Sequence, residues 1–281
     1  MKKLLLLVML TPNLLQAQWH ANIFGGFSNY SGDLQSRFVT TAESYAAFGL
    51  GLQYDLTNHL SVIMGGNYGH VGAADKYNKT SLQPRNLSFE TSIVELNLMA
   101  EYNILDLTKY RFTPYGFVGI AVYHFNPFAY DTTGRKVFLK PLSTEGEGLP
   151  QYPASKPYAL TQFAIPFGGG IKFRINDQIT IAYELGLRKL FTDYLDDVST
   201  SYVDKTTLLN AKGPLAVEMA YRGAELKGGA PYPAAGEKRG SPKSKDWYYF
   251  SGIRLSIAFN SIKLNSQKTK MGIIDCPKKV N

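Results

Sequence analysis

Charged side chains recur at alternate positions of segments that are otherwise apolar or small. In the sequence ITIAYELGLRK at residues 179–189, Glu184 and Arg188 share one side with Thr180 and Ala182. Ions of opposite sign that are removed from water have to pair, because an isolated buried charge is costly. These positions therefore predict a charge-compensated interior network rather than an open pore. Its candidate members are Glu95, Glu101, Lys172, Arg174, Glu184, Arg188 and Arg254.

Four acidic residues lie close together in the sequence TDYLDDVSTSYVD at residues 192–204. Carboxylate oxygens are the ligands that Ca²⁺ prefers, so Asp193, Asp196, Asp197 and Asp204 are candidate ligands. Their spacing does not match an EF-hand loop, and aspartate side chains also cap turns. Turn capping is the favoured interpretation, and we predict no metal and no cofactor.

Histidine beside a serine and an acid could supply the general base of a hydrolase or acyltransferase. His70 and His124 are both expected near the same rim of the fold, where serines and acids also occur. No serine stands out as the nucleophile. A rim enzyme is therefore the weaker alternative, and we predict that the protein is not an enzyme.

The last segment of the chain combines a single thiol with many lysines. Cys276 is the only cysteine, so an exported chain would leave it free or bridge it to another protein, and both options stay open. A basic tail suits an acidic protein surface or anionic lipid headgroups, and nucleic acid is not an expected partner of an exported chain. The lysines are Lys263, Lys268, Lys270, Lys278 and Lys279.

The elements that would position these side chains are β-strands, because apolar residues alternate with small or polar ones. The apolar face is continuous and the other face is rich in glycine, which is typical of a narrow membrane barrel rather than a soluble sandwich. The orientation of the fifth strand stays open, because both of its faces are apolar. The eight predicted strands are 18–30, 46–55, 60–69, 92–102, 114–125, 163–174, 179–188 and 247–259.

The connections between these strands alternate in length. The second, fourth and sixth are short, whereas the others are long and include loops at 71–87, 126–160 and 189–246. Short turns on one side and long loops on the other are typical of outer-membrane barrels. We therefore predict an all-β, eight-stranded antiparallel transmembrane barrel with extracellular loops and both termini in the periplasm.

The N-terminal segment has the features of a signal peptide. Lys2 and Lys3 precede the apolar run 4–10, and Ala17 is a plausible residue at the cleavage site. No later apolar run is long enough for a membrane-spanning helix. The predicted organisation is a signal peptide at 1–17, an outer-membrane barrel at 18–260 and a basic periplasmic tail at 261–281.

Several motifs, taken together, resemble those of one known family. Two are fairly specific, EGEGLPQYP at 145–153 and the TDYLDDVST block within 184–204. The set resembles the PorG-like outer-membrane barrels of Bacteroidota, a component of the type IX secretion system, over essentially the whole chain to Asn260. Ser241 departs from the pattern, because an aspartate often precedes the proline there. The remaining motifs are YSGD at 30–33, the segment 115–127 that ends in HFNP, KPYALTQFAIPFGGGIK at 156–172 and SPKSKDWYYFSGI at 241–253.

The resemblance implies a non-enzymatic role at a protein-export machine. The family's barrel contacts a periplasmic ring made by a lipoprotein and its partner, PorK and PorN, and the machine exports proteins that carry a C-terminal signal. We hypothesise that the basic tail docks on the ring lipoprotein and that Cys276 forms a disulfide with it. The competing class is a stand-alone barrel of the OmpA or OmpW sort, acting as a channel, adhesin or surface-binding protein.

Overall fold

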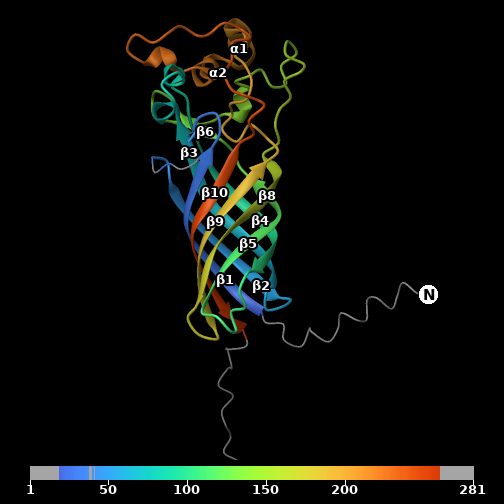
Figure 1. Cartoon of the computed structure of the whole chain (residues 1–281). Coiled ribbons are helices and arrows are strands. Elements are labelled where there is room, and N and C mark those ends of the chain that lie inside the picture. Colours follow the sequence, from blue (N-terminus) through green and yellow to red (C-terminus); the bar gives the residue numbers. More distant parts are fainter. Residues whose placement is uncertain (1–18, 38–39, 41, 260–281) are drawn as a thin grey trace, which may run out of the picture.

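The computed structural model describes residues 19–37, 40 and 42–259. Within these residues, eight long antiparallel strands form a barrel that closes because β1 pairs with both β2 and β10 (Figure 1). The predicted eight-stranded barrel is confirmed. The strands are β1 (Trp19–Ser31), β2 (Tyr45–Asp55), β3 (Leu60–Ala74), β4 (Ser88–Asn103), β5 (Phe112–His124), β8 (Thr161–Arg174), β9 (Ile179–Leu190) and β10 (Trp247–Ala258).

The outer surface of the barrel is apolar and the inner surface is polar. On β4, Leu96 points outward and is 68% exposed, whereas the preceding residue, Glu95, points inward and is completely buried. The same alternation gives β5 its orientation, which the sequence left open: Ile120 faces outward and Ala121 faces the interior. The outer surface carries large apolar side chains all round, and the charges are buried inside. Such a surface is suited to contact with lipid. No described helix is long and apolar enough to cross a membrane.

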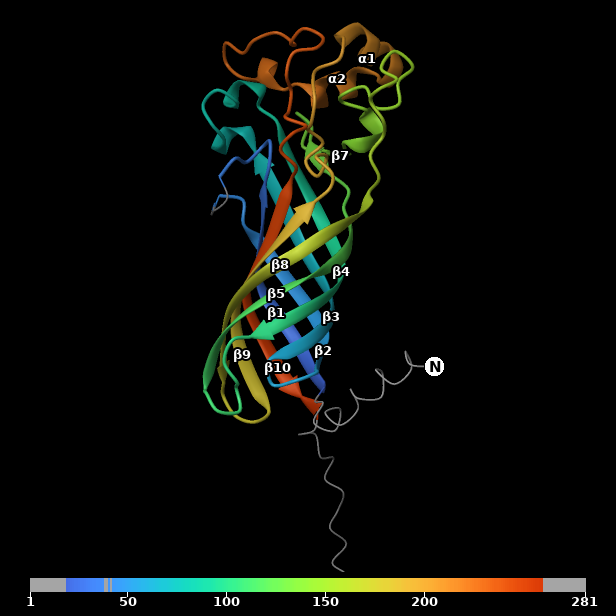
Figure 2. The same cartoon turned by 45° about the vertical axis from the view of Figure 1, so that its right-hand side comes forward.

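The two ends of the barrel differ, as the alternating connection lengths predict. The short connections 56–59, 104–111 and 175–178 lie at one end, here called the turn end. The four longer ones lie at the opposite end, the loop end (Figures 1 and 2). The last residue of β10, Ala258, donates its backbone N–H to the turn residue Gln178 at 2.9 Å, so β10 finishes at the turn end.

The third strand and the long loops are more structured than the sequence indicated. Strand β3 does not stop near Gly69; it continues to Ala74 and pairs with the first residues of β4. The predicted loop at 126–160 holds the hairpin β6 (Phe128–Tyr130) and β7 (Lys136–Phe138), and β6 pairs with β4. The predicted loop at 189–246 holds the helices. They are α1 (Lys205–Lys212) and α2 (Pro214–Ala220), followed by the 3₁₀ turn η6 (Gly223–Glu225). The other 3₁₀ turns lie in the other two loops: η3 (Asp75–Tyr77) and η4 (Gln83–Arg85) between β3 and β4, and η5 (Lys140–Leu142) between β7 and β8.

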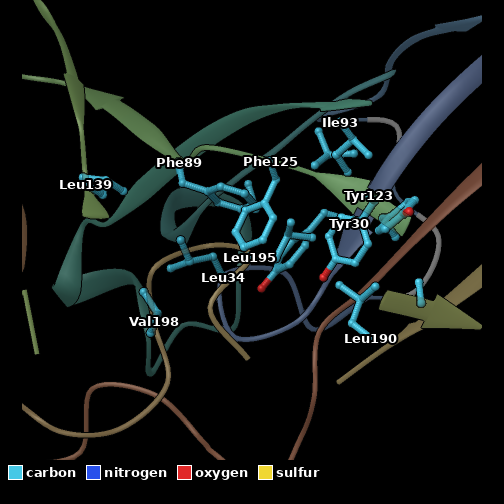
Figure 3. Close-up of a cluster of buried hydrophobic side chains, with 14 of the residues drawn as sticks. Tyr30, Leu34, Phe89, Ile93, Tyr123, Phe125, Leu139, Leu190, Leu195 and Val198 are labelled. Atoms are coloured by element: carbon cyan, nitrogen blue, oxygen red, sulfur yellow. The ribbon is translucent and has the colours of Figure 1, made fainter. Parts of the chain in front are cut away.

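Three loops, 75–87, 125–160 and 191–246, pack together over the loop end, and we call them the cap. A buried apolar cluster joins the cap to the barrel (Figure 3). Tyr30 and Tyr123 come from barrel strands, whereas Leu195 and Val198 come from the cap, and all four are almost inaccessible. Because full burial of each large apolar side chain contributes about 1.5–3 kcal/mol, this cluster holds the cap on the barrel mouth.

Candidate functional site

The barrel interior contains two groups of ion pairs, one above the other. Near the turn end, Glu101 on β4 pairs with both Lys172 on β8 and Arg254 on β10. Arg254 Nε also lies 3.4 Å from Glu184 Oε2, an ion-pair distance without the alignment of a hydrogen bond. The hydroxyl of Tyr115 donates to Glu184 Oε2 at 3.1 Å. Two acids thus face two bases across the lumen.

The second group lies closer to the loop end and is centred on Glu95. Arg188 donates to both carboxylate oxygens of Glu95, at 2.9 and 3.1 Å. The same carboxylate accepts from Asn67 at 2.7 Å, from Asn97 at 2.8 Å and from the Tyr248 hydroxyl at 2.7 Å. Arg188 and Glu95 thus form a forked pair, and the other acceptor sites of the carboxylate are also used. Such a pair is strong and has a fixed geometry, and it crosses the lumen at this level.

Between the two groups is a small cavity of about 40 Å³. Three buried polar atoms on residues that line it have no hydrogen-bond partner within the described protein: Asn22 Oδ1, Asn97 Oδ1 and Arg254 Nε. Polar cavities of this size accommodate water, which satisfies such atoms. The lumen therefore holds a small polar cavity between two groups of ion pairs that cross the barrel.

Six of the seven predicted interior charges are brought together in these two groups, and one is not. Arg174 ends β8 at the turn end, where it contacts Asp177 at 3.4 Å, and that aspartate is almost fully exposed. Its predicted interior position is wrong, because the last residue of a strand leaves the narrow part of the barrel. The polar partners Tyr115, Tyr248 and Asn67 were not singled out from the sequence, although they occupy the same inward alternation.

The cap is held by a second set of buried charges. Arg239 donates to Glu145 Oε1 at 3.0 Å and lies 3.9 Å from Asp197 Oδ2, and the side chains of all three are at most 2% exposed. Burial alone would lower the pKa of Arg239, but Glu145 and Asp197 hold it above its usual value. Glu145 also accepts from the backbone of Ser199 and Thr200, which ties loop 125–160 to loop 191–246. The sequence did not indicate Arg239.

The aspartates of the 192–204 block make internal bonds. Asp204 caps α1 by accepting from the Thr207 N–H at 2.7 Å, and Asp196 accepts from the Val198 N–H at 2.9 Å. Asp197 accepts from the Thr144 hydroxyl at 2.6 Å. Within the described ranges, no three His, Cys, Asp or Glu side chains are arranged to hold a metal ion. The capping interpretation fits Asp204 and Asp196, whereas the buried Asp197 bonds a side chain of another loop, Thr144, and the buried Asp193 accepts from the Ser199 hydroxyl at 2.9 Å.

The two rim histidines flank β4 on its two sides. His70 on β3 is paired with Ser92 of β4, and His124 on β5 is paired with the neighbouring Val94. Both histidines project from the outer face near the loop end. His124 Nδ1 lies 3.0 Å from Thr161 Oγ1, whereas His70 contacts both a serine and a carboxylate. The basic lysines and Cys276 of the predicted tail lie outside the described residues.

A comparison with known families decides the class of protein. The family model described as "Outer membrane protein beta-barrel domain" matches residues 4–211. The chain belongs to this family. The outer-membrane barrel, as we now call it, therefore resides in the bacterial outer membrane, and its apolar outer surface faces that membrane's lipid.

The chain is also similar, at low sequence identity, to several solved structures. Neisserial surface protein A is 8% identical with a TM-score of 0.43, covering 86% of this chain and 99% of its own. The attachment invasion locus protein Ail of Yersinia pestis is 9% identical with a TM-score of 0.40 over the same shares. OprG from Pseudomonas aeruginosa is 11% identical with a TM-score of 0.40, covering 85% and 95%. No curated protein matches the chain.

Proposed function

We propose that this outer-membrane barrel is an anchor of the type IX secretion machinery, a non-enzymatic role in which it holds a periplasmic lipoprotein ring to the outer membrane. The cap would then be extracellular, and both ends of the chain would be periplasmic. The observation that carries the proposal is the closed lumen combined with a chain that leaves β10 at the turn end. A barrel without a through-pore suits a membrane anchor, and the segment that follows β10 starts on the side opposite the cap.

The tail is the part of the chain that we propose contacts the ring. Residues 261–281 carry five lysines against one acid, Asp275, and the only cysteine, Cys276. A PorK-type lipoprotein would offer an acidic surface and a cysteine, and a PorN-type protein would complete the ring. The periplasm is oxidising, so an intermolecular disulfide would persist there.

Replacing Cys276 with serine is expected to remove a reductant-sensitive band that is heavier than the monomer by one lipoprotein. The measurement is a non-reducing gel of outer-membrane fractions, probed for this chain with and without reductant. The variant Ser266→Cys, placed in the Cys276→Ser background, is a matched control that keeps one thiol in the same tail. A monomer band in both lanes of the unaltered protein would rule out the covalent link, and pull-down of the ring would then decide whether docking is noncovalent.

The alternative is a stand-alone barrel that acts as a channel, adhesin or surface-binding protein. The cap of this barrel is well packed, and this observation favours a role in binding at the cell surface. Pull-down of ring components with the purified barrel separates the two functions: co-purification supports the anchor, and its absence supports the stand-alone barrel.

The purified barrel is expected to give no resolvable single-channel current in a planar bilayer. The reason is that an eight-stranded barrel has room only for side chains, and two layers of ion pairs cross this one. The double variant Glu95→Ala and Arg188→Ala removes one layer without leaving an unpaired charge, and we expect no current from it either, because Glu101, Lys172 and Arg254 still cross the lumen. A steady current through the unaltered barrel would support the channel alternative instead.

A further inference from the structure

Three side chains at the loop end form a hydrogen-bonded chain on the outer surface of the barrel. His70 Nε2 lies 2.9 Å from Glu90 Oε2, and His70 Nδ1 lies 3.3 Å from Ser92 Oγ. Glu90 and Ser92 are two residues apart on β4, so both project from the same face of that strand. His70 lies directly opposite Ser92 on β3. The order is therefore serine, histidine and carboxylate.

The carboxylate determines which nitrogen of the histidine is free to accept a proton. An ionised Glu90 can only accept, so the hydrogen of neutral His70 lies on Nε2. Nδ1 then carries the lone pair, and it is Nδ1 that faces the hydroxyl of Ser92. Ser92 thus donates to a base that is itself oriented by an acid, which is the arrangement that activates a serine nucleophile.

The hydrogen-bonded Ser92, His70 and Glu90 lie where polar side chains give way to exposed apolar ones along the outer surface. This is the level at which lipid tails meet polar groups. The ring of Tyr45 packs edge-on against His70 at 4.7 Å between centroids, and the Tyr68 hydroxyl donates to Ser92 Oγ at 3.2 Å. On the same face of β4, Val94 and Leu96 follow, more than half exposed to the lipid side. The side chains of His70 and Glu90 are 22% and 33% exposed, so a molecule in the bilayer can reach them.

We propose that Ser92, His70 and Glu90 form a hydrolase site for acyl esters of membrane lipids, in addition to the anchoring role, which needs no catalysis. The acyl chain would lie along Val94 and Leu96, with the ester carbonyl at Ser92. This substrate class follows from the position of the nucleophile, because the ester carbonyls of membrane lipids lie at the boundary between tail and headgroup. The activity is independent of the secretion proposal.

The reaction has two steps. Ser92 Oγ bonds to the ester carbonyl carbon and its proton passes to His70 Nδ1, while Tyr68 is the nearest hydroxyl that can donate to the developing oxyanion. The ester C–O bond then breaks, the released alcohol takes the proton from His70, and the acyl group stays on Ser92. Water attacks this acyl ester, passes one proton to His70 and releases the fatty acid, and Ser92 regains its proton.

The test uses the purified full-length barrel in vesicles of palmitoyl-oleoyl phosphatidylethanolamine, together with a fluorophosphonate probe that labels activated serines. We expect fatty-acid release and labelling of one serine, Ser92. Ser92→Ala should abolish labelling, and either Ser92→Ala or His70→Gln should slow hydrolysis by about 10³-fold or more. Glu90→Gln should also slow hydrolysis strongly, because the glutamine amide can donate to His70 Nε2 and then places the imidazole hydrogen on Nδ1, where it cannot accept the proton of Ser92.

Two matched controls separate the site from general damage. Ser251 also projects outward and bonds a tyrosine, Tyr183, at 2.8 Å, so Ser251→Ala tests an outer serine that bonds a tyrosine rather than a histidine. His124→Gln tests the other rim histidine. Both should keep full activity, and heat-modifiable gel mobility shows that each variant is folded. Folded, unaltered barrel that neither takes the probe nor releases fatty acid would overturn the proposal, as would hydrolysis unchanged in Ser92→Ala.

Discussion

Replacing Glu101 with glutamine is expected to destabilise the barrel by about 3–5 kcal/mol, the usual cost of removing one partner from a buried ion pair. Glu101 is completely buried and is shared by Lys172 and Arg254. The glutamine keeps the size of the side chain but removes its charge. Lys172 would retain only neutral partners such as Asn103, whose amide oxygen lies 2.9 Å from Nζ. The free energy of unfolding, measured by urea titration of the barrel in lipid vesicles, would fall accordingly.

Two further variants test whether charge is the cause. Lys172→Met added to Glu101→Gln removes the orphaned cation, leaves Arg254 with Glu184, and should recover much of the lost stability. Arg174→Gln is the surface control, since its exposed pair with Asp177 should contribute at most about 1 kcal/mol. A Glu101→Gln barrel that is no less stable than Arg174→Gln would show that these interior pairs do not hold the strands together.

The barrel wall could be predicted from the sequence because lipid imposes a strict two-residue period on it. The prediction failed where that constraint ends. Residues 71–74, VGAA, are buried on both faces because β3 runs upward beneath the cap, so no alternation marks them as strand. Arg174 was wrongly predicted to lie inside the barrel for a different reason. It follows the inward-facing alternation of β8, but it lies at the open turn end.

The sequence does not show which charged residues pair with each other inside the barrel. Glu95 lies on β4 and Arg188 on β9, strands that are not neighbours, so their contact depends on how the strands tilt and stagger as the barrel closes. Arg239 likewise depends on a contact distant in sequence, with Glu145. It was missed because its surroundings, rich in glycine, proline and lysine, gave no sign of burial. His70 was identified from the sequence, but Ser92 could be selected as its partner only from the register of β3 and β4.

The cap is expected to loosen as the pH rises from mildly acidic to mildly alkaline. Burial raises the pKa of Asp193 to about 7 and that of Asp197 to about 6, although Arg239 opposes the second shift. Burial, with Asp197 and Glu145 nearby, raises the pKa of Glu147 to about 8. Carboxyls in the unfolded chain titrate near about 4, so the folded cap holds its protons to higher pH. Its stability is therefore full below about pH 4 and declines as the pH passes about 6–8.

A tyrosine shared by two acids gives the strongest reason for this direction. The Tyr30 hydroxyl lies 2.5 Å from Asp196 Oδ2 and 2.9 Å from Asp246 Oδ1. A phenol has one hydrogen to donate, so one of the two carboxyls has to be protonated for both contacts to form. Burial raises the pKa of both aspartates well above the usual range, and nearby Asp33 and Asp193 add to the effect. Losing that proton would place two anions around one hydroxyl.

Asp246→Asn is the variant that isolates this contact. Its amide can still accept from the Leu195 N–H, which Asp246 Oδ2 accepts at 2.9 Å, and its NH₂ can donate to Tyr30, but it cannot ionise. Hydrogen exchange of cap amides, corrected for the intrinsic effect of pH, should show protection falling between about pH 5.5 and pH 8.5 in the unaltered barrel and falling less in Asp246→Asn. Asp204→Asn changes an exposed helix cap and should leave the pH profile unchanged. Cap protection that stays level or rises with pH in the unaltered barrel would contradict the shared-proton arrangement.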